Sequence, residues 1–431
     1  MARSLLIISY YWPPAGGPGV QRWLKFTTYL QQMGYDLNLI IPENPDYPVL
    51  DESLLSEIPR GLNIIEVPIF EPSRLLSSLS RKRTKNLQRG IIKKKQSLVE
   101  RWVIWARGNL FVPDARVGWK HRVVKVAAEF IAKNPESTVI TTGPPHSVHL
   151  NGLDLKRKFS QIKWLADFRD PWTTIGYHHK LRLGKSARQK HENLEQKVLN
   201  QADRVVVTSP HTQQEFEQKT TKPVAVVTNG YDIQPNENIQ QPSGKFKLSH
   251  VGTLLSDRNP QVLWAVLSEL CDENSSFCND LELHLAGNVS EEILRSIESH
   301  LPSKVLKRHG YLNHEDAIEL MYESQILLLI EINSEITKAI IPGKIFEYLA
   351  SRRPIVALGP AGADIEQIIE YNHAGSYFSY QDHTELKAEL FRLYNLYKSG
   401  NNSGNSIDFF REYHRSQTTQ QLAAEIEKMW E

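Results

Sequence analysis

The loop at residues 13–19 contains the first group of residues that could bind a ligand. It has three glycines, Gly16, Gly17 and Gly19, and stands between a predicted strand and a predicted helix. Glycines let a backbone approach a ligand closely, and the first turn of a helix offers unpaired N–H groups and a partial positive charge. The loop therefore suits an anion such as a phosphate, with a tight turn that binds nothing as the alternative. It matches neither the Gly-x-Gly-x-x-Gly dinucleotide pattern nor the P-loop pattern.

Two further segments place polar side chains directly after predicted strands. His146 lies in the segment Gly-Pro-Pro-His-Ser at 143–147, and Asp167 and Asp170 flank Arg169 in a later segment. Ligands of parallel α/β folds bind beyond the carboxyl ends of strands, so these side chains could orient a sugar or receive the proton of its hydroxyl. The alternatives are a structural histidine and a buried ion pair that closes the domain.

The second half of the chain has two candidate segments. A Pro-Gly pair precedes a predicted helix on which Lys344 and Glu347 share one face. A lysine at a helix N-terminus opposes the helix dipole, so we expect an anionic partner, and a glutamate can accept two hydrogen bonds from a ribose diol. Arg258 follows another predicted strand and could neutralise a diphosphate leaving group. The alternatives are an exposed Lys–Glu pair and a solvated arginine.

Composition excludes several classes of protein. The 431 residues have 51 Lys+Arg and 49 Asp+Glu, so the chain is no polycation that coats nucleic acid. Eight basic and no acidic residues fall at 81–95, and the rest of the chain has more acidic than basic residues. Two cysteines exclude a disulfide scaffold and fit a reducing cytosol. With no apolar run of about 18 residues, no signal peptide and no metal-ligand spacing, we expect a cytoplasmic protein without a required metal or other cofactor.

Strands and helices alternate along almost the whole sequence. This alternation predicts an α/β protein with two parallel, doubly wound sheets and a ligand site in the cleft between them. We expect an N-terminal domain at 1–232 with a basic insertion near 71–115, a polar linker at 233–245, a C-terminal domain at 246–410 and a final helix at 411–431, for which packing against the first domain is one option. The predicted strands are 5–10, 37–41, 62–67, 138–142, 163–168, 205–208, 224–228, 246–251, 281–286, 326–331, 355–358 and 376–378.

Five segments together resemble family-4 glycosyltransferases of the GT-B fold, particularly the bacterial surface-polysaccharide type. The resemblance covers nearly the whole chain, and the segments are specific only jointly. They are Tyr-Tyr-Trp-Pro-Pro-Ala-Gly-Gly-Pro-Gly at 10–19, Gly-Pro-Pro-His-Ser at 143–147, Asp-Phe-Arg-Asp-Pro-Trp at 167–172, Thr-Asn-Gly-Tyr-Asp at 228–232 and Pro-Gly-Lys-Ile-Phe-Glu-Tyr-Leu-Ala at 342–350.

The resemblance implies two Rossmann-like domains, with a nucleotide-sugar donor on the second and the acceptor on the first. It also implies transfer with retention of configuration and without a metal. It matches His146 to a histidine near the transferred sugar and Arg258 to a cation for the pyrophosphate; with Asp170, which we single out from its place after a strand, these are the residues that we expect in catalysis. For donor binding it implies Gly16, Gly17, Gly19, Arg258 and Glu347, and we add Lys344 and Thr253 from their places in the sequence.

The sequence departs from the family pattern at two positions. Ala339 stands where an acidic residue is expected, and Thr253 where a basic residue is expected. Lys344 could replace the missing cation, whereas no evident residue replaces the carboxylate, although Glu331 and Glu335 lie upstream.

The function that we predict is transfer of a sugar to a glycan or lipid-linked acceptor in cell-surface polysaccharide synthesis. The alternatives are a nucleotide-sugar epimerase of the same fold and a non-catalytic subunit that binds a sugar nucleotide or glycan. The basic run at 81–95 and the following Trp102 and Trp105 suggest contact with an anionic membrane on the inner face of the plasma membrane. A solvated basic loop before an ordinary packed helix is the other interpretation. We expect no nucleic-acid partner.

Overall fold

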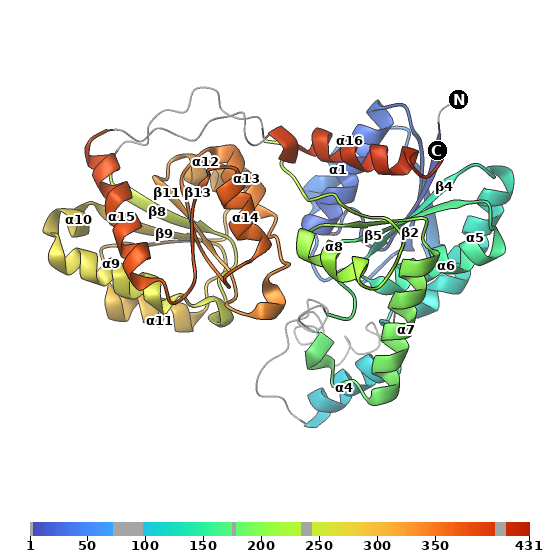
Figure 1. Cartoon of the computed structure of the whole chain (residues 1–431), viewed down its shortest axis with the longest axis horizontal. Helices are drawn as coiled ribbons and strands as arrows, with labels where there is room; N and C mark the ends of the chain where they lie inside the picture. The colour runs from blue at the N-terminus through green and yellow to red at the C-terminus, as the bar shows by residue number, and fades with distance from the viewer. Residues whose placement is uncertain (1–2, 72–97, 175–177, 234–243, 401–410) are drawn as a thin grey trace. The chain divides into compact units, whose positions relative to one another are not determined.

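The computed structural model describes residues 3–71, 98–174, 178–233, 244–400 and 411–431. The chain forms two compact units, the first made of Met1–Asn229 and Arg415–Glu431 and the second of Gly230–His414 (Figure 1). The basic run at 81–95 and most of the predicted linker, 234–243, lie outside the described residues.

A parallel sheet of seven strands forms the centre of the first unit, in the order β3-β2-β1-β4-β5-β6-β7. The interior strand β1 contains a run of four fully buried residues, 5–8, which is typical of a strand covered on both faces. The strands are β1 (Ser4–Ser9), β2 (Asp36–Glu43), β3 (Asn63–Pro68), β4 (Thr138–Gly143), β5 (Lys163–Phe168), β6 (Arg204–Val207) and β7 (Val224–Val226).

Helices of the first unit follow its strands as the alternation predicts. In α1, Val20, Trp23, Leu24 and Leu30 recur at helical spacing and are buried against the sheet. The chain leaves this helix through Gly34, whose φ of 90° favours glycine. The helices are α1 (Pro18–Gln32), α4 (Leu98–Asn109), α5 (Lys120–Lys133), α6 (His149–Lys158), α7 (Lys185–Gln201), α8 (Pro210–Glu217) and α16 (Arg415–Glu427).

The C-terminal helix α16 belongs to the first unit. In Figure 1 this helix, in red, lies beside α1, in blue. Arg415 donates to the Gln21 carbonyl at 3.2 Å, and the Tyr35 hydroxyl donates to Glu427 at 2.7 Å. The chain therefore returns to its N-terminal unit after completing the second one.

A second parallel sheet, of six strands, forms the centre of the second unit, in the order β10-β9-β8-β11-β12-β13. Strand β10 was not predicted, because its sequence Leu-Lys-Arg-His-Gly is polar and lies at the sheet edge. The strands are β8 (Phe246–Val251), β9 (Leu281–Ala286), β10 (Leu306–Gly310), β11 (Ile326–Ile330), β12 (Ile355–Leu358) and β13 (Gly375–Phe378).

The helices of the second unit complete the alternation. They are α9 (Gln261–Glu273), α10 (Ser275–Asp280), α11 (Glu291–His300), α12 (His314–Tyr322), α13 (Lys344–Ser351), α14 (Asp364–Tyr371) and α15 (His383–Lys398). Two clusters of buried apolar side chains pack in this unit, one that includes Trp264 and Phe246 and one that includes Phe346 and Tyr348. The predicted class, an α/β protein with two parallel sheets, is confirmed.

Candidate functional site

A cavity of about 430 Å³ lies in the first unit, where β1, β4 and β5 end. It brings together five of the residues predicted from the sequence, although these residues come from three separate segments. Its wall includes Gly16, Gly17, Gly19, His146 and Asp170, together with Tyr11, Arg107, Asp114, Arg116, Arg169, Trp172, His178 and His191.

The glycine loop forms one side of this cavity. Gly17 stands before the first turn of α1 with φ of 116°, a conformation that favours glycine, and no side chain caps this helix end. A Cβ atom on Gly19 would collide with the guanidinium of Arg169. Gly19 is therefore needed for the approach of an arginine that the sequence places 150 positions later, whether or not the loop also binds an anion.

His146 lies in the wall of the cavity, and only 4 % of its surface is exposed. Its ring stacks on Trp172 with centroids 5.1 Å apart and planes within 6° of parallel. Neither ring nitrogen has a hydrogen-bond partner among the described residues. Burial holds the pKa of His146 well below its usual range, with His149 and Arg169 acting in the same direction. The ring is therefore neutral near pH 7 and can exchange hydrogen bonds with a hydroxyl group.

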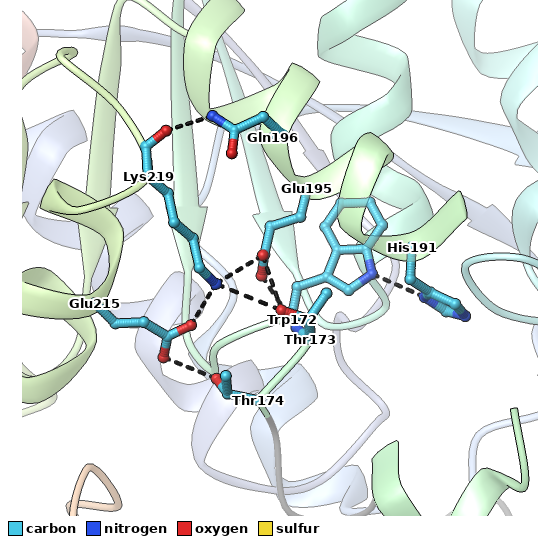
Figure 2. Close-up of polar contacts among 8 residues, drawn as sticks. All are labelled: Trp172, Thr173, Thr174, His191, Glu195, Gln196, Glu215 and Lys219. Atoms are coloured by element: carbon cyan, nitrogen blue, oxygen red, sulfur yellow. Dashed lines mark hydrogen bonds and ion pairs between the residues drawn. The ribbon is translucent and has the colours of Figure 1, made fainter. Parts of the chain in front are cut away.

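A partly buried polar network holds Trp172 and the residues after it in place (Figure 2). The indole N–H of Trp172 donates to His191 Nδ1 at 3.1 Å, and Glu195 accepts from the backbone N–H and hydroxyl of Thr173 at 3.0 and 2.9 Å. Lys219 reaches Glu195 at 2.8 Å and Glu215 at 2.5 Å. The network connects α7 and α8 to the segment after β5, so it fixes the surface on which His146 stacks.

The two aspartates of the Asp-Phe-Arg-Asp segment have different surroundings. Asp167 is fully buried, 3.0 Å from Arg22 Nη2, and accepts from Trp23 Nε1 at 2.7 Å. Burial acts to raise the pKa of Asp167, but Arg22 and these hydrogen bonds lower it overall. Asp167 is thus the structural ion pair considered from the sequence, whereas Asp170 lines the cavity, where burial raises its pKa.

In the second unit, Lys344 begins α13 at the carboxyl edge of the sheet. Its ammonium lies 3.4 Å from His250 Nε2, and a Cβ atom on Gly252 would be 3.3 Å from it. Burial lowers the pKa of Lys344 to about 8, with Glu331 acting to raise it and Arg258 to lower it further. Burial also keeps the pKa of His250 well below its usual range, so His250 is a neutral neighbour.

Arg258 is held by a carboxylate that follows β11. Its Nη2 lies 3.2 Å from Glu331 Oε2, and its Nη1 donates to the Thr253 carbonyl at 3.4 Å. Glu331 is only 4 % exposed, and its other oxygen, Oε1, has no hydrogen-bond partner in the described part of the chain. Burial raises the pKa of Glu331, while Arg258 and Lys344 lower it. Arg258, Glu331 and Lys344 therefore form one charged cluster, in which Thr253 takes part through its backbone.

Glu347 lies one turn after Lys344 on α13. Its Oε1 is 4.0 Å from Nδ1 of His314, at the start of α12. A second cavity, of about 620 Å³, lies where β9 and β10 end, and its lining includes Gly287, His309 and Tyr311. Along this edge of the sheet, the cavity, Glu347 and the Arg258–Lys344 cluster all stand at the carboxyl ends of strands.

Two of these residues were not singled out from the sequence, and Glu331 was named there only as a carboxylate upstream of Ala339. His250, like Glu331, stands near the carboxyl end of a predicted strand, so its position alone could have indicated it. Arg116 gave no such signal, because it lies in an irregular segment and reaches the cavity only through folding. Among the described residues, no group of three or more His, Cys, Asp and Glu side chains is arranged to hold a metal ion.

Comparisons with known proteins identify the fold. No family model and no curated protein matches the sequence. Similar solved structures include an α,α-trehalose 6-phosphate synthase from Burkholderia multivorans, with TM-score 0.61, 11% identity and coverage of 100% of this chain and 99% of that one. They also include Anabaena HepE in complex with UDP-glucose, with TM-score 0.57, 13% identity and coverage of 99% of both chains. A putative UDP-N-acetylglucosamine 2-epimerase from Listeria monocytogenes has TM-score 0.53, 12% identity and coverage of 100% of this chain and 97% of that one. At these identities the similarity shows the fold alone, and that fold is GT-B.

Proposed function

We propose that this protein is a retaining glycosyltransferase that moves a sugar from a nucleotide-sugar donor to a glycan or lipid-linked acceptor, in the synthesis of a cell-surface polysaccharide. The observation that carries the proposal is Lys344. This half-buried cation stands at the carboxyl edge of a parallel sheet, where its ammonium lies 3.4 Å from a neutral histidine. Glu331 acts on it electrostatically, but among the described residues no carboxylate forms a direct ion pair with it. A desolvated ammonium in this position requires an anionic ligand, and a diphosphate supplies one.

The rest of the donor follows from the order of features along the same edge. Lys344 and Arg258 hold the diphosphate, Glu347 accepts the ribose hydroxyls and the cavity beside Tyr311 receives the base. This order is supported by the 4.0 Å separation of Glu347 from His314, three residues after Tyr311. Charge-assisted hydrogen bonds of the kind given to Glu347 contribute about 1.5–3 kcal/mol each.

The charge that develops on the departing diphosphate is the main target of catalysis. Arg258 and Lys344 stabilise this charge. That Gly16, Gly17 and Gly19 bind donor phosphates through the N–H groups of α1 stays a prediction from the sequence. The acceptor hydroxyl attacks the face that the leaving group vacates, and the leaving phosphate assists in removing its proton. His146 and Asp170 orient the hydroxyl and need not ionise.

This sequence has Ala339 at the position where the family pattern has an acidic residue. We assign the role of that missing carboxylate to Glu331. We assign to its Oε1, which has no hydrogen-bond partner among the described residues, a hydrogen bond from a hydroxyl of the transferred sugar; Arg258 pairs with the other oxygen of this carboxylate, and Lys344 acts on it electrostatically. The carboxylate therefore reaches the cluster from β11 and not from the segment before α13.

Thermal unfolding with a panel of nucleotide sugars tests the donor site, because a ligand that binds only the native state raises its stability. We expect one nucleotide class to raise the melting temperature of the full chain. Glu347→Ala should weaken binding of that donor by about 1–3 kcal/mol and leave unfolding of the free protein unchanged. Lys398→Ala is the matched control. Lys398 pairs with Asp280, which directly precedes β9 and so lies at the amino ends of the strands, away from the proposed donor site. Normal donor affinity in Glu347→Ala would remove Glu347 from the site.

Two other functions remain to be separated from transfer. An epimerase, the activity named for the similar Listeria protein, would convert the sugar nucleotide without any acceptor. A binding subunit would hold the donor and transfer nothing, an alternative that Ala339 and Thr253 motivate. Analysis of the donor after incubation with and without acceptor distinguishes all three outcomes.

Membrane contact through α4 is part of the proposal. Trp102 and Leu110 are 69 % and 66 % exposed, and the ring of Trp105 packs on that of Trp102. Exposed tryptophans next to a segment with eight basic residues suit the surface of an anionic bilayer, where a lipid-linked acceptor would be found. Among the helices that the structure describes, none is long and apolar enough to cross a membrane.

A further inference from the structure

We propose that the acceptor itself carries an oxyanion, a carboxylate or a phosphate, which Arg116 binds in the cavity of the first unit. This inference rests on the proposed function, because it names the substrate class of the cavity that contains His146. It starts from a buried guanidinium group to which the sequence motifs assign no role.

Arg116 is only 7 % exposed, and its side chain lines the cavity. Its guanidinium carbon lies 5.0 Å from the centre of the Tyr10 ring, and its Nε is 3.5 Å from Glu71 Oε1. Nη2 is buried and has no hydrogen-bond partner among the described residues. A buried donor on a charged group is costly to leave unsatisfied, so its position in a cavity wall points to a ligand that completes it.

Glu71 does not satisfy this arginine, because its Oε1 lies 3.5 Å from Nε and makes no hydrogen bond to it. Oε1 accepts from the Tyr10 hydroxyl at 2.5 Å, and Oε2 accepts from the Asp46 backbone N–H at 2.6 Å. Glu71 therefore pairs with the charge of Arg116 on its Nε side and leaves both Nε and Nη2 without a hydrogen-bond acceptor among the described residues. A guanidinium presents parallel N–H groups that match the two oxygens of a carboxylate or phosphate.

One carboxylate, that of Asp114, holds the backbone of Arg116 and of Ser147, the residue after His146. Asp114 accepts from the Arg116 backbone N–H at 2.9 Å and from the backbone N–H and hydroxyl of Ser147 at 2.8 and 2.7 Å. The anion-binding group and the hydroxyl-orienting group are thus parts of one rigid frame. Such a frame can place an acceptor hydroxyl by holding a charged group on the same molecule.

The other cavity walls favour an acidic sugar over a simple ion. Arg107 and Arg169 line the cavity with Arg116, against Asp114 and Asp170, and Asp114 is already engaged by Ser147. The rings of Tyr11 and Trp172 add apolar surface that suits one face of a pyranose. A neutral sugar would leave Nη2 of Arg116 unmatched, whereas a uronate or a sugar phosphate would satisfy it.

Isothermal titration of the full chain with glucose, glucuronate, glucose 6-phosphate and inorganic phosphate tests this inference, each with and without saturating UDP. We expect glucuronate or glucose 6-phosphate to bind about tenfold or more tightly than glucose, and to do so also with UDP present. The preferred ligand then distinguishes a carboxylate from a phosphate. Equal affinity for glucose and both acidic sugars would overturn the inference, and so would loss of acidic-sugar binding when UDP is bound. If inorganic phosphate binds as tightly as glucose 6-phosphate, the sugar contributes nothing to binding, and the inference that the ligand is a saccharide is overturned.

Variants assign the preference to Arg116. Arg116→Gln should remove the tenfold preference. Arg116→Lys, which keeps the positive charge but loses the paired N–H donors of the guanidinium, should reduce it. Arg122→Gln is the control, since Arg122 is exposed on α5 and donates to the Pro68 carbonyl. Unchanged UDP affinity shows that each variant is folded, and an unchanged preference in both Arg116 variants would overturn the assignment. A missing response to every nucleotide sugar would instead refute the proposed function and leave the acidic-sugar result standing.

Discussion

Replacement of Lys344 by methionine tests the donor site most directly, because it removes a charge and keeps most of the side-chain volume. A diphosphate that accepts one charge-assisted hydrogen bond from this ammonium gains about 1.5–3 kcal/mol, which corresponds to roughly 10- to 100-fold in Kd. The lysine also imposes a pH dependence on the affinity. Burial lowers the pKa of Lys344 to about 8 in the free protein, and only the protonated form binds an anion well.

The sign of this dependence follows from the ionisation state. Below pH 8 Lys344 is charged and the affinity for a nucleotide sugar should be flat, whereas above pH 8 it should fall by up to about tenfold per pH unit. The neighbours do not produce this slope. His250 stays neutral because its pKa is lowered, and the hydroxyls of Tyr348 and Tyr380 stay protonated because their pKa values are raised.

Titration calorimetry from about pH 7 to pH 10, with the donor that stabilises the protein most, measures both effects. The native protein should lose affinity above pH 8, Lys344→Met should be weaker at pH 7 and independent of pH, and Lys398→Met should behave as the native protein. An identical slope in the native protein and Lys344→Met, or a Kd that the substitution leaves unchanged, would refute the diphosphate assignment.

Three further predictions concern the remaining parts of the molecule. Glu331→Gln should reduce turnover about tenfold or more while donor binding changes little, because the negative charge that contacts the transferred sugar and Arg258 is lost. Full turnover in steady-state kinetics would contradict this role. Lys219→Met should lower the free energy of unfolding by roughly 1–3 kcal/mol in urea titrations, because it leaves the buried carboxylate of Glu195 without its cation, and a loss smaller than the scatter among surface variants would count against it. The double variant Trp102→Ala, Trp105→Ala should lose co-sedimentation with anionic vesicles, whereas Phe391→Ala, which removes a 40 % exposed aromatic side chain from α15, should not; binding of the native protein to neutral vesicles alone would argue against the basic segment.

The order of elements is the part of the structure that could be predicted from local pattern. Buried runs such as 5–8 on β1 and the helical spacing of Trp23 and Leu24 on α1 depend only on the sequence nearby, because each element must bury its own apolar face. Strand β10 could not be predicted in this way, because an edge strand does not need an apolar face to bury. The carboxyl-end positions of His146 and Lys344 followed from the same alternation.

Tertiary contacts decide which of the candidate site residues lie together. Sequence alone could not separate Asp167, paired with Arg22 across 145 positions, from Asp170 in the cavity wall. Nor could it pair Arg258 with Glu331, 73 positions away. Local sequence determines where a strand or helix forms, because backbone conformation and burial of one face are local properties. The partner of each charge depends on which strand ends become neighbours in the sheet, and strand order is a property of the folded chain alone.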